Sequence, residues 1–365
     1  MSATALFYAS RLPGREERVY KNFFYMLPKK IRRLRSRLRR IARAIIAALD
    51  WLRYRAAEYS MRVFVRALPR MPARVLSGLT SAVSRATYVM LWKYRRRMEQ
   101  NLAVAMANEL PSDEQRDLIV RKAWRNFAQG ILETLRLMHA PKERVRGIVE
   151  MEGEEHLRRA MAKGKGVIAL SAHLGNFTLI GVRLAAAGYS FSALIKQPRD
   201  PRFARLMDDY RMKAGVTTIS AKPRSQAVRG VLKALRAKRV VLIIADEFKS
   251  GDVPVEFFGI RSPAPRGPAT FALRTGAATV PMFMVRDAND RLTLRIEPEI
   301  ELSRSDGLED DVAANTVLFT RVIEAMIRRH PDQWNWLGFQ RGGLRARKRK
   351  KINGSKGLRV EGIEP

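Results

Sequence analysis

The pattern of hydrophobic and polar positions changes near residue 148, where short apolar runs begin to alternate with stretches of helical periodicity. The apolar runs predict strands at 166–171, 192–196, 216–219, 239–245, 278–286 and 292–298. The stretches between them predict helices at 177–187, 200–213, 225–237 and 267–275. Strands separated by helices form mostly parallel sheets that are covered on both faces. We therefore expect an α/β fold with a mixed, mostly parallel sheet flanked by helices. The last strand, extended to Ile300, follows its predecessor through a polar turn and is predicted to be an antiparallel edge.

A basic amphipathic pattern precedes this region. From Lys29 to Leu52 the apolar residues recur every three or four positions, at Ile31, Leu34, Leu38, Ile41, Ile45, Leu49 and Leu52. The opposite face carries Arg32, Arg33, Arg35, Arg37, Arg39, Arg40 and Arg43. This pattern is typical of a helix that lies on an anionic membrane surface. A solvated helix packed on its own domain and a heptad seam to a partner helix are the alternatives. Repulsion among the arginines disfavours both unless an anionic partner neutralises them.

These patterns divide the chain into four parts. We expect an N-terminal segment at 1–28, a basic amphipathic helical membrane-association region at 29–98, an α/β domain at 99–340 and a basic flexible tail at 341–365. Within the third part, Ser112 and Gln115 form a capping pattern that predicts a helix running to about Met138. The first segment lacks the pattern of a signal peptide. No window of about 18–20 residues is free of charge, so no conventional transmembrane helix is expected.

Composition points to an anionic partner. The chain has 70 Lys and Arg against 35 Asp and Glu, a formal net charge of +35. Nucleic acid, an anionic membrane and acidic substrates or carriers all fit such a balance. The chain has no cysteine, which excludes disulfides, a cysteine nucleophile and thiolate metal sites. Its four histidines show no metal-ligand spacing, so we expect no metal.

The strongest candidate for chemistry is His173. It follows the apolar run at 166–171, and Gly175 and Asn176 then turn the chain into the next predicted helix. This order places His173 at the carboxyl end of a strand, where open α/β sheets hold their ligands. A histidine there is a candidate general base for a hydroxyl. The alternative is a surface or hydrogen-bonded structural histidine.

Two carboxylates end another predicted strand. Asp246 and Glu247 follow the run at 239–245, so we expect them at the same sheet edge as His173. They are candidate partners for His173. They would alternatively cap the following turn or pair with a nearby arginine.

A set of motifs, in a fixed order, extends over roughly residues 90–345. The set consists of His173-Leu174-Gly175-Asn176-Phe177, Asp246-Glu247, Val255 to Gly259, Arg266-Gly267-Pro268-Ala269, Ala272 to Gly276 with Val280 to Phe283, and Gln333 to Trp336 with Arg341. It resembles the bacterial lipid A biosynthesis acyltransferases, the lauroyl/myristoyl transferase branch of the H-x4-D/E acyltransferases. Asn101-Leu102, Asn126-Phe127 and Glu133 also match that family. Two positions depart from it: Thr178 stands where the family has Glu or Asp, and Glu247 stands where it has Gln.

The resemblance implies a membrane-associated O-acyltransferase with a glycerolipid-acyltransferase-like fold, so that 99–340 is the acyltransferase domain. The acyl donor would be an acyl carrier protein or coenzyme A thioester, with no bound cofactor. The acceptor would be a hydroxyl of a lipid A precursor or a related glycolipid. His173, Asn176, Thr178 and Asp246 would form the catalytic group. Gly175, Lys196, Arg199, Arg211, Glu247 and Arg266 would bind substrate, and Leu179, Ile180 and Leu184 would line an acyl-chain groove.

The same resemblance implies a peripheral, monotopic place on the cytoplasmic face of a bacterial inner membrane. Anionic membrane lipids and an acidic acyl carrier protein would be partners of a chain with charge +35. Nucleic-acid binding is suggested by the charge alone. It is disfavoured because the sequence has no aromatic-basic platform or reading helix.

Thr178 leaves three interpretations open. A threonine carries no charge to stabilise a protonated histidine, and loss of the orienting acid costs on the order of 10⁴-fold in rate in serine hydrolases. Asp246 or Glu247 would take over the acid's role, the chain would be a catalytically inactive lipid-binding homologue or partner subunit, or the acid would have been replaced on purpose.

Overall fold

The computed structural model describes residues 29–68, 71–198, 200–248 and 251–339. The chain divides into two compact units, Met1–Phe64 and Val65–Pro365. Predictions for the segment 1–28, for Arg199 and for the tail 341–365 lie outside the described residues. The expected four-part division stays a prediction.

The first unit contributes most of one long helix. Helix α3 spans Lys29–Ala67, so the predicted helix is present and extends well beyond Leu52. Its apolar face is open to solvent, with Leu38 56% and Leu49 60% exposed. Among the described residues, no helix is both long enough and apolar enough to cross a membrane.

Three helices begin the second unit: α4 (Ala73–Met90), α5 (Trp92–Ala105) and α6 (Asp113–Leu137). The predicted start of α6 is confirmed. The Gln115 N–H donates to Ser112 Oγ (3.2 Å), and the Ser112 N–H donates to Gln115 Oε1 (3.3 Å), which satisfies two N–H groups of the first turn. Two short helices, α7 (Lys142–Ile148) and α8 (Glu154–Ala162), follow.

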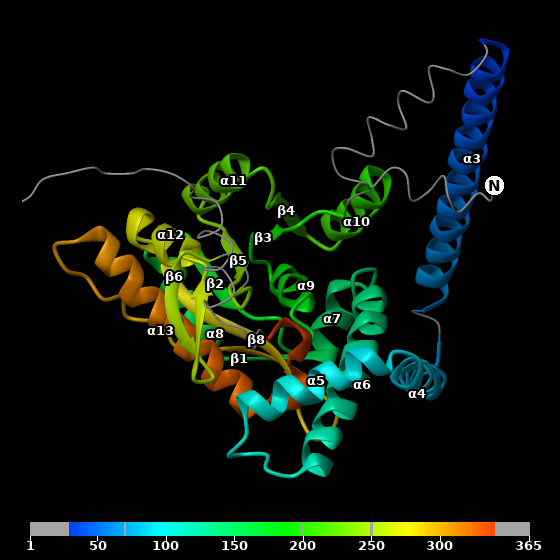
Figure 1. Cartoon of the computed structure of the whole chain (residues 1–365). Helices are drawn as coiled ribbons and strands as arrows, with labels where there is room; N and C mark the ends of the chain where they lie inside the picture. The colour runs from blue at the N-terminus through cyan, green and yellow to red at the C-terminus, as the bar shows by residue number, and fades with distance from the viewer. Residues whose placement is uncertain (1–28, 69–70, 199, 249–250, 340–365) are drawn as a thin grey trace, which may run out of the picture. The chain divides into compact units, whose positions relative to one another are not determined.

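A seven-stranded sheet forms the centre of the second unit (Figure 1), in the order β1-β9-β8-β2-β5-β3-β4. Its strands are β1 (Val149–Glu152), β2 (Val167–Ser171), β3 (Phe191–Ile195), β4 (Val216–Ser220), β5 (Val240–Ile244), β8 (Ala278–Arg286) and β9 (Leu292–Ile296). Every pair is parallel except β8 with β9. The mixed, mostly parallel α/β sheet and all six predicted strands are confirmed.

The predicted edge strand is wrong. Strand β9 is antiparallel to β8, as expected, but β1 pairs with its other side, so β9 lies inside the sheet. Strand β1 has only four residues, two of them Glu150 and Glu152. So short a segment has no periodicity that sequence patterns can detect.

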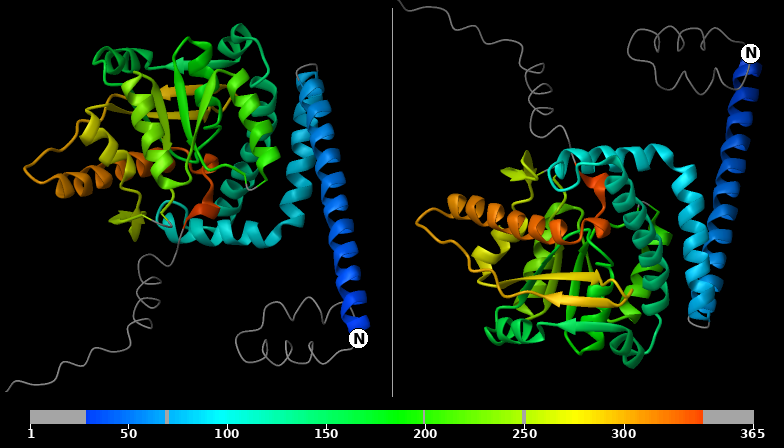
Figure 2. Two further views of the ribbon diagram at one scale, coloured as in Figure 1. Left: turned by 90° about the horizontal axis from the view of Figure 1, so that it is seen from above. Right: turned by 90° about the horizontal axis from the view of Figure 1, so that it is seen from below.

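Helices cover both faces of the twisted sheet (Figure 2). The four predicted ones are α9 (Leu179–Ala186), α10 (Pro201–Lys213), α11 (Arg224–Arg236) and α12 (Gly267–Thr275). A further helix, α13 (Leu308–Arg329), two 3₁₀ turns, η3 (Pro331–Gln333) and η4 (Trp336–Gly338), and a hairpin, β6 (Val253–Phe257) with β7 (Ile260–Ala264), were not anticipated by the pattern.

Alternation along the strands separates two environments. Ile168, Val241 and Ile243 pack with the buried side of α11 and with α12 residues. Leu242 and Ile244 point to the opposite face, since successive strand residues alternate. That opposite face, beside α9, holds the candidate site.

Candidate active site

A cavity of about 470 Å³ lies on the α9 face of the sheet, bounded by α6, α9, α10, β3, β4 and β5. We call it the His173 cavity. Its walls are mostly apolar and include the side chains of Phe177, Val182, Phe191, Leu194, Val216 and Leu242. His173 and Thr178 line it together with Lys196, Arg211 and Glu247. An apolar pocket with a few convergent polar groups is the usual form of a small-molecule site.

His173 and Asp246 form a hydrogen-bonded pair at the carboxyl edge of the sheet. Nδ1 of His173 lies 2.8 Å from Oδ1 of Asp246, and the backbone N–H of His173 donates to Oδ2 (2.8 Å). The Asp246 side chain is 2% exposed, whereas that of His173 is 34% exposed. Strands β2 and β5 are neighbours in register, which brings the two strand ends together. His173 and Asp246 therefore lie close together at the same sheet edge, as expected.

Trp334 completes the environment of the carboxylate. Its indole Nε1–H donates to Oδ2 of Asp246 (2.8 Å), and the indole is buried among Phe257, Phe258 and Trp336. Two N–H groups, of the His173 backbone and the Trp334 indole, thus donate to Oδ2 of Asp246. A carboxylate only accepts hydrogen bonds, so Nδ1 of His173 carries the hydrogen in this pair and Nε2 is the unprotonated nitrogen of the neutral ring.

The turn after His173 is fixed by its backbone. The N–H of Gly175 donates to the carbonyl of Gln333 (2.8 Å), and the N–H of Asn176 donates to the carbonyl of Met284 (3.2 Å). Gly175 has a φ of +55°, and a Cβ there would collide with the Met284 carbonyl. Only glycine fits this close approach. Gly175 therefore holds the turn, and its N–H is occupied within the protein.

Thr178 bonds to the polar side chains beside the turn. Its Oγ1 donates to Oδ1 of Asn176 (2.7 Å) and lies 2.6 Å from Oγ1 of Thr134, which also donates to Oδ1 of Asn176 (2.9 Å). The three residues form a closed group at the wall of the cavity, with Asn176 buried.

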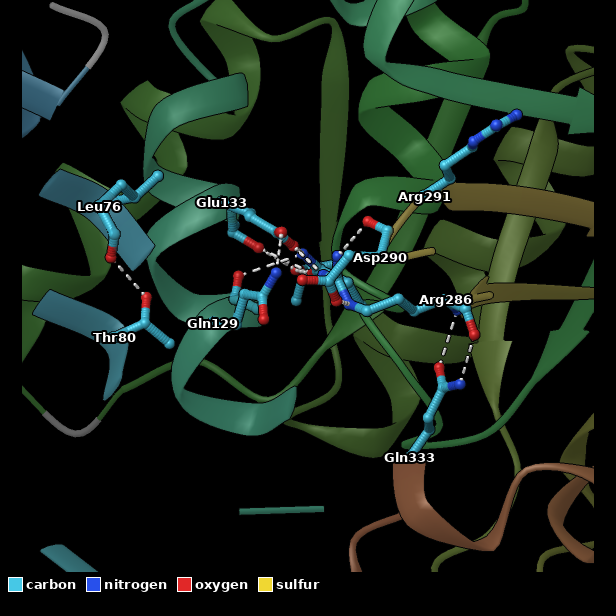
Figure 3. A network of polar contacts seen from close by, with 12 residues as sticks. Leu76, Thr80, Gln129, Glu133, Arg286, Asp290, Arg291 and Gln333 are labelled. Atoms are coloured by element: carbon cyan, nitrogen blue, oxygen red, sulfur yellow. Dashed lines mark hydrogen bonds and ion pairs between the residues drawn. The ribbon is translucent and has the colours of Figure 1, made fainter. Parts of the chain in front are cut away.

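Behind this group lies a charged network that links four elements (Figure 3). Nδ2 of Asn176 approaches Oε2 of Glu133 (3.4 Å), and the same oxygen accepts from Arg286 (2.5 Å). Gln333 exchanges two hydrogen bonds with the backbone of Arg286, of 2.9 and 2.7 Å. Sequence reasoning did not single out Arg286 or Thr134. Their partners are far away in the sequence, and local sequence patterns do not predict such contacts.

The other predicted substrate contacts divide into two groups. Lys196, Arg211 and Glu247 line the His173 cavity, and Arg211 also pairs with Asp208 (2.9 Å). Arg266 is not part of that lining. Its guanidinium pairs with Glu309 (2.7 Å), which raises the pKa of Arg266 and lowers that of Glu309.

The residues predicted to line an acyl-chain groove do not line this cavity. Leu179, Ile180 and Leu184 are fully buried, and none of them lines the cavity. Helix α9 presents Gly181 and Val182 to it instead. Sequence placed the correct helix beside His173 but could not say which of its faces meets the sheet, because nearly every residue of α9 is apolar. Among the described residues, no group of three or more His, Cys, Asp or Glu is arranged to hold a metal ion.

A histidine paired with a buried carboxylate, opening on an apolar cavity, is suited to activating a hydroxyl next to a long apolar chain. The profile of the family described as bacterial lipid A biosynthesis acyltransferase matches residues 47–340. The chain belongs to that family and is an acyltransferase.

Similar characterised proteins act on different glycolipids. The phosphatidylinositol mannoside acyltransferase of Mycolicibacterium smegmatis is 26% identical over 275 residues, 75% of this chain and 86% of that protein. The lipid A biosynthesis palmitoleoyltransferase of Escherichia coli is 25% identical, over 62% of this chain and 72% of its own length. The lipid A biosynthesis lauroyltransferase of the same organism is 23% identical, over 73% and 85%.

Proposed function

We propose that the chain transfers a fatty acyl group from an acyl carrier protein or coenzyme A thioester to a hydroxyl of a lipid A precursor or a related glycolipid. The observation that carries the proposal is the His173–Asp246 pair at the wall of the apolar cavity. The relatives support this substrate class, since their names include lipid A and phosphatidylinositol mannoside acyltransferases.

In the proposed mechanism Nε2 of His173 removes the proton of the acceptor hydroxyl. The oxygen attacks the thioester carbonyl, and the tetrahedral intermediate then expels the thiolate. The imidazolium returns the proton to the thiolate, so the products are the ester and the free thiol of the carrier. Asp246 keeps Nδ1 protonated and stabilises the imidazolium during this cycle.

In this mechanism Asp246 supplies the acid that this chain lacks at position 178. The carboxylate reaches His173 from β5, on the neighbouring strand, instead of from the helix that follows the histidine. A retained His–carboxylate pair is the reason to favour an active enzyme over an inactive lipid-binding homologue.

The length and the volume of the cavity support an approximate length for the acyl chain. Phe191, which lines it, is level with Val167 in the sheet, and His173 lies six residues beyond Val167. At ~3.3 Å per strand residue and ~1.2 Å per bond of an extended chain, the space along the sheet holds roughly 16 bonds. One water molecule occupies ~30 Å³ in the liquid. If each heavy atom of the acyl chain takes the same volume, the cavity holds roughly 16 atoms. Both values fit acyl chains of up to about 16 carbons.

Charged groups at the same cavity fit the polar ends of the substrates. Lys196 and Arg211 place positive charge beside His173, where a phosphate of the sugar lipid or of phosphopantetheine would bind. The formal charge of +35 suits an acidic acyl carrier protein and anionic lipids. We place the chain peripherally on the cytoplasmic face of the inner membrane, with the apolar face of α3 in contact with lipid.

Acyl transfer in detergent tests the proposal. Thioesters of several chain lengths serve as donors, and a phosphorylated glucosamine lipid and a phosphatidylinositol mannoside serve as acceptors. We expect turnover by the wild type, its loss in His173→Ala, and a fall on the order of 10⁴-fold in kcat for Asp246→Asn. Asp209→Asn, an exposed carboxylate on α10, is the matched control and should retain full activity.

Two results would contradict parts of the proposal. Wild-type protein that transfers nothing to either acceptor, but gains activity in Thr178→Glu, would show an inactive lipid-binding homologue. Full activity in Asp246→Asn would remove Asp246 from the mechanism.

A further inference from the structure

A second cavity lies against α6, apart from the residues that form the His173 cavity. It has a volume of about 250 Å³ and is bounded by α4, α6, the end of α7, and the β8–β9 turn with the start of β9. We call it the Arg136 cavity. Glu133 lines it, while the next residue, Thr134, lines the His173 cavity. Figure 3 shows part of its polar lining, with Gln129 and Glu133 of α6 on the side of Asp290 and of Arg286, which does not itself line the cavity.

The lining of this cavity carries two arginines and two carboxylates. Arg125 stands exposed on its lining, and Arg136 is half-buried. Nε of Arg136 is closed off from solvent and has no hydrogen-bond partner, and within the described part of the chain neither arginine forms an ion pair. A buried donor without a partner is costly, and a bound acceptor would satisfy it.

Both carboxylates at the cavity form ion pairs with Arg286. Glu133 pairs with Arg286 (2.5 Å), and Asp290 pairs more loosely with the same guanidinium (3.7 Å). Arg286 therefore stands against both carboxylates, while Arg125 and Arg136 remain without a counter-charge among the described residues. The lining together with Arg286 carries three arginines and two carboxylates, a formal excess of one positive charge, so a monoanion would neutralise this group.

The rest of the lining is apolar. Leu76, Leu132, Leu137, Ile148 and Leu292 contribute side chains to it. The volume corresponds to roughly eight heavy atoms at ~30 Å³ each, so the ten heavy atoms of an eight-carbon carboxylate would fill it and reach its opening. An inorganic anion would leave this apolar surface wet, whereas a neutral hydrocarbon would leave Arg136 unsatisfied.

We propose that the Arg136 cavity is a second binding site, separate from the His173 cavity, for a small amphiphilic monoanion of the medium-chain carboxylate class. The carboxylate accepts hydrogen bonds from Arg136 and meets Arg125 at the opening, and the alkyl chain packs on the leucine side chains. This site does not depend on the acyltransferase mechanism.

Calorimetric titration of octanoate into the full chain at fixed ionic strength tests the proposal. Arg136→Gln removes the buried guanidinium, and Arg144→Gln, an exposed arginine on α7 that lines neither cavity, is the matched control. We expect Arg136→Gln to weaken one class of octanoate sites about tenfold or more, the range for a charge-assisted hydrogen bond, and Arg144→Gln to leave it unchanged. Octanoate that also enters the His173 cavity would still bind there in Arg136→Gln. The variant therefore distinguishes binding at the two cavities.

A second variant and two further probes complete the test. Ser77→Trp places a bulky ring at the exposed side of the lining without changing its charge, and it should abolish the same class of sites. Octylammonium and acetate should each bind at least about tenfold more weakly than octanoate, since one has the wrong charge and the other lacks the alkyl chain. Equal affinity for octanoate in Arg136→Gln and Arg144→Gln would overturn the site, and equal affinity for acetate would overturn the amphiphilic ligand.

Discussion

The hydroxyl of Thr178 shows how a single residue can be reassigned within a family motif. Where the family carries an acid, this chain has a hydroxyl that bonds to Asn176 and Thr134. The Asn176 side chain is in turn held by Gly130 (3.1 Å) and Glu133. Position 178 thus stabilises the turn that carries His173, while Asp246 contacts the histidine itself.

Replacement of Thr178 by valine tests this role. Valine keeps the branched shape but leaves Oδ1 of Asn176 with one donor fewer, so unfolding free energy should fall by about 1–2 kcal/mol. Thr178→Ser keeps the hydroxyl and is the control. Chemical denaturation of both variants gives the two free energies, and kcat should fall far less in Thr178→Val than in Asp246→Asn. A valine variant as slow as Asp246→Asn would instead give Thr178 a direct part in the chemistry.

At the scale of elements, the sheet and its helices were largely predictable, because continuous apolar runs such as 240–244 and the phased helices at 201–213 and 224–236 leave clear local signals. The proximity of His173 and Asp246 followed from the rule for carboxyl ends of strands, whereas their hydrogen bond is known only from the structure. Three features were beyond local pattern: the short β1, the phase of α9, and the link from Glu133 to Arg286. Each depends on contacts between segments far apart in the sequence.

Helix α9 and strand β3 also determine the far wall of the His173 cavity. Gly181 faces Phe191 so closely that an added Cβ would collide with the ring. Phe191→Leu should therefore lengthen the preferred acyl chain, and Gly181→Ala should shorten it by forcing the ring toward the cavity. Donor thioesters of 10 to 18 carbons, compared by kcat/KM, measure both shifts; ~1–3 kcal/mol per methylene mismatch corresponds to about 10- to 200-fold in kcat/KM.

The two variants are expected to change the preferred acyl-chain length in opposite directions. A general loss of stability would not produce this result. Unchanged chain-length profiles in both active variants would place the acyl chain outside this cavity. Inactive protein throughout would instead count against the acyltransferase proposal.

At the scale of the whole molecule, the charge of +35 and the exposed apolar face of α3 both support the proposed binding to an anionic lipid surface. Sequence alone indicated this, since amphipathicity and charge are properties of the local pattern. The structure adds that within the described residues Leu38, Ile41, Ile45, Leu49 and Leu52 are all more than half exposed. Such an apolar stripe on a helix is costly in water and favourable at a lipid interface.

Vesicle binding tests the role of α3 in the full chain. The sequence pattern predicts Arg39, Arg40 and Arg43 on the basic face of the helix. Replacement of all three by Gln should weaken binding to vesicles that contain phosphatidylglycerol by roughly 100-fold, since each basic residue near an anionic surface contributes ~1 kcal/mol. Arg229, Lys233 and Arg236 on α11 are exposed, and their replacement by Gln removes the same charge elsewhere. This control should reduce binding far less, because those residues accompany no exposed apolar stripe.

Wild-type binding should also weaken between 50 and 500 mM salt as the Debye length shortens from ~14 to ~4 Å. Equal losses in the two triple variants would mean that overall charge, and not α3, holds the protein to the lipid.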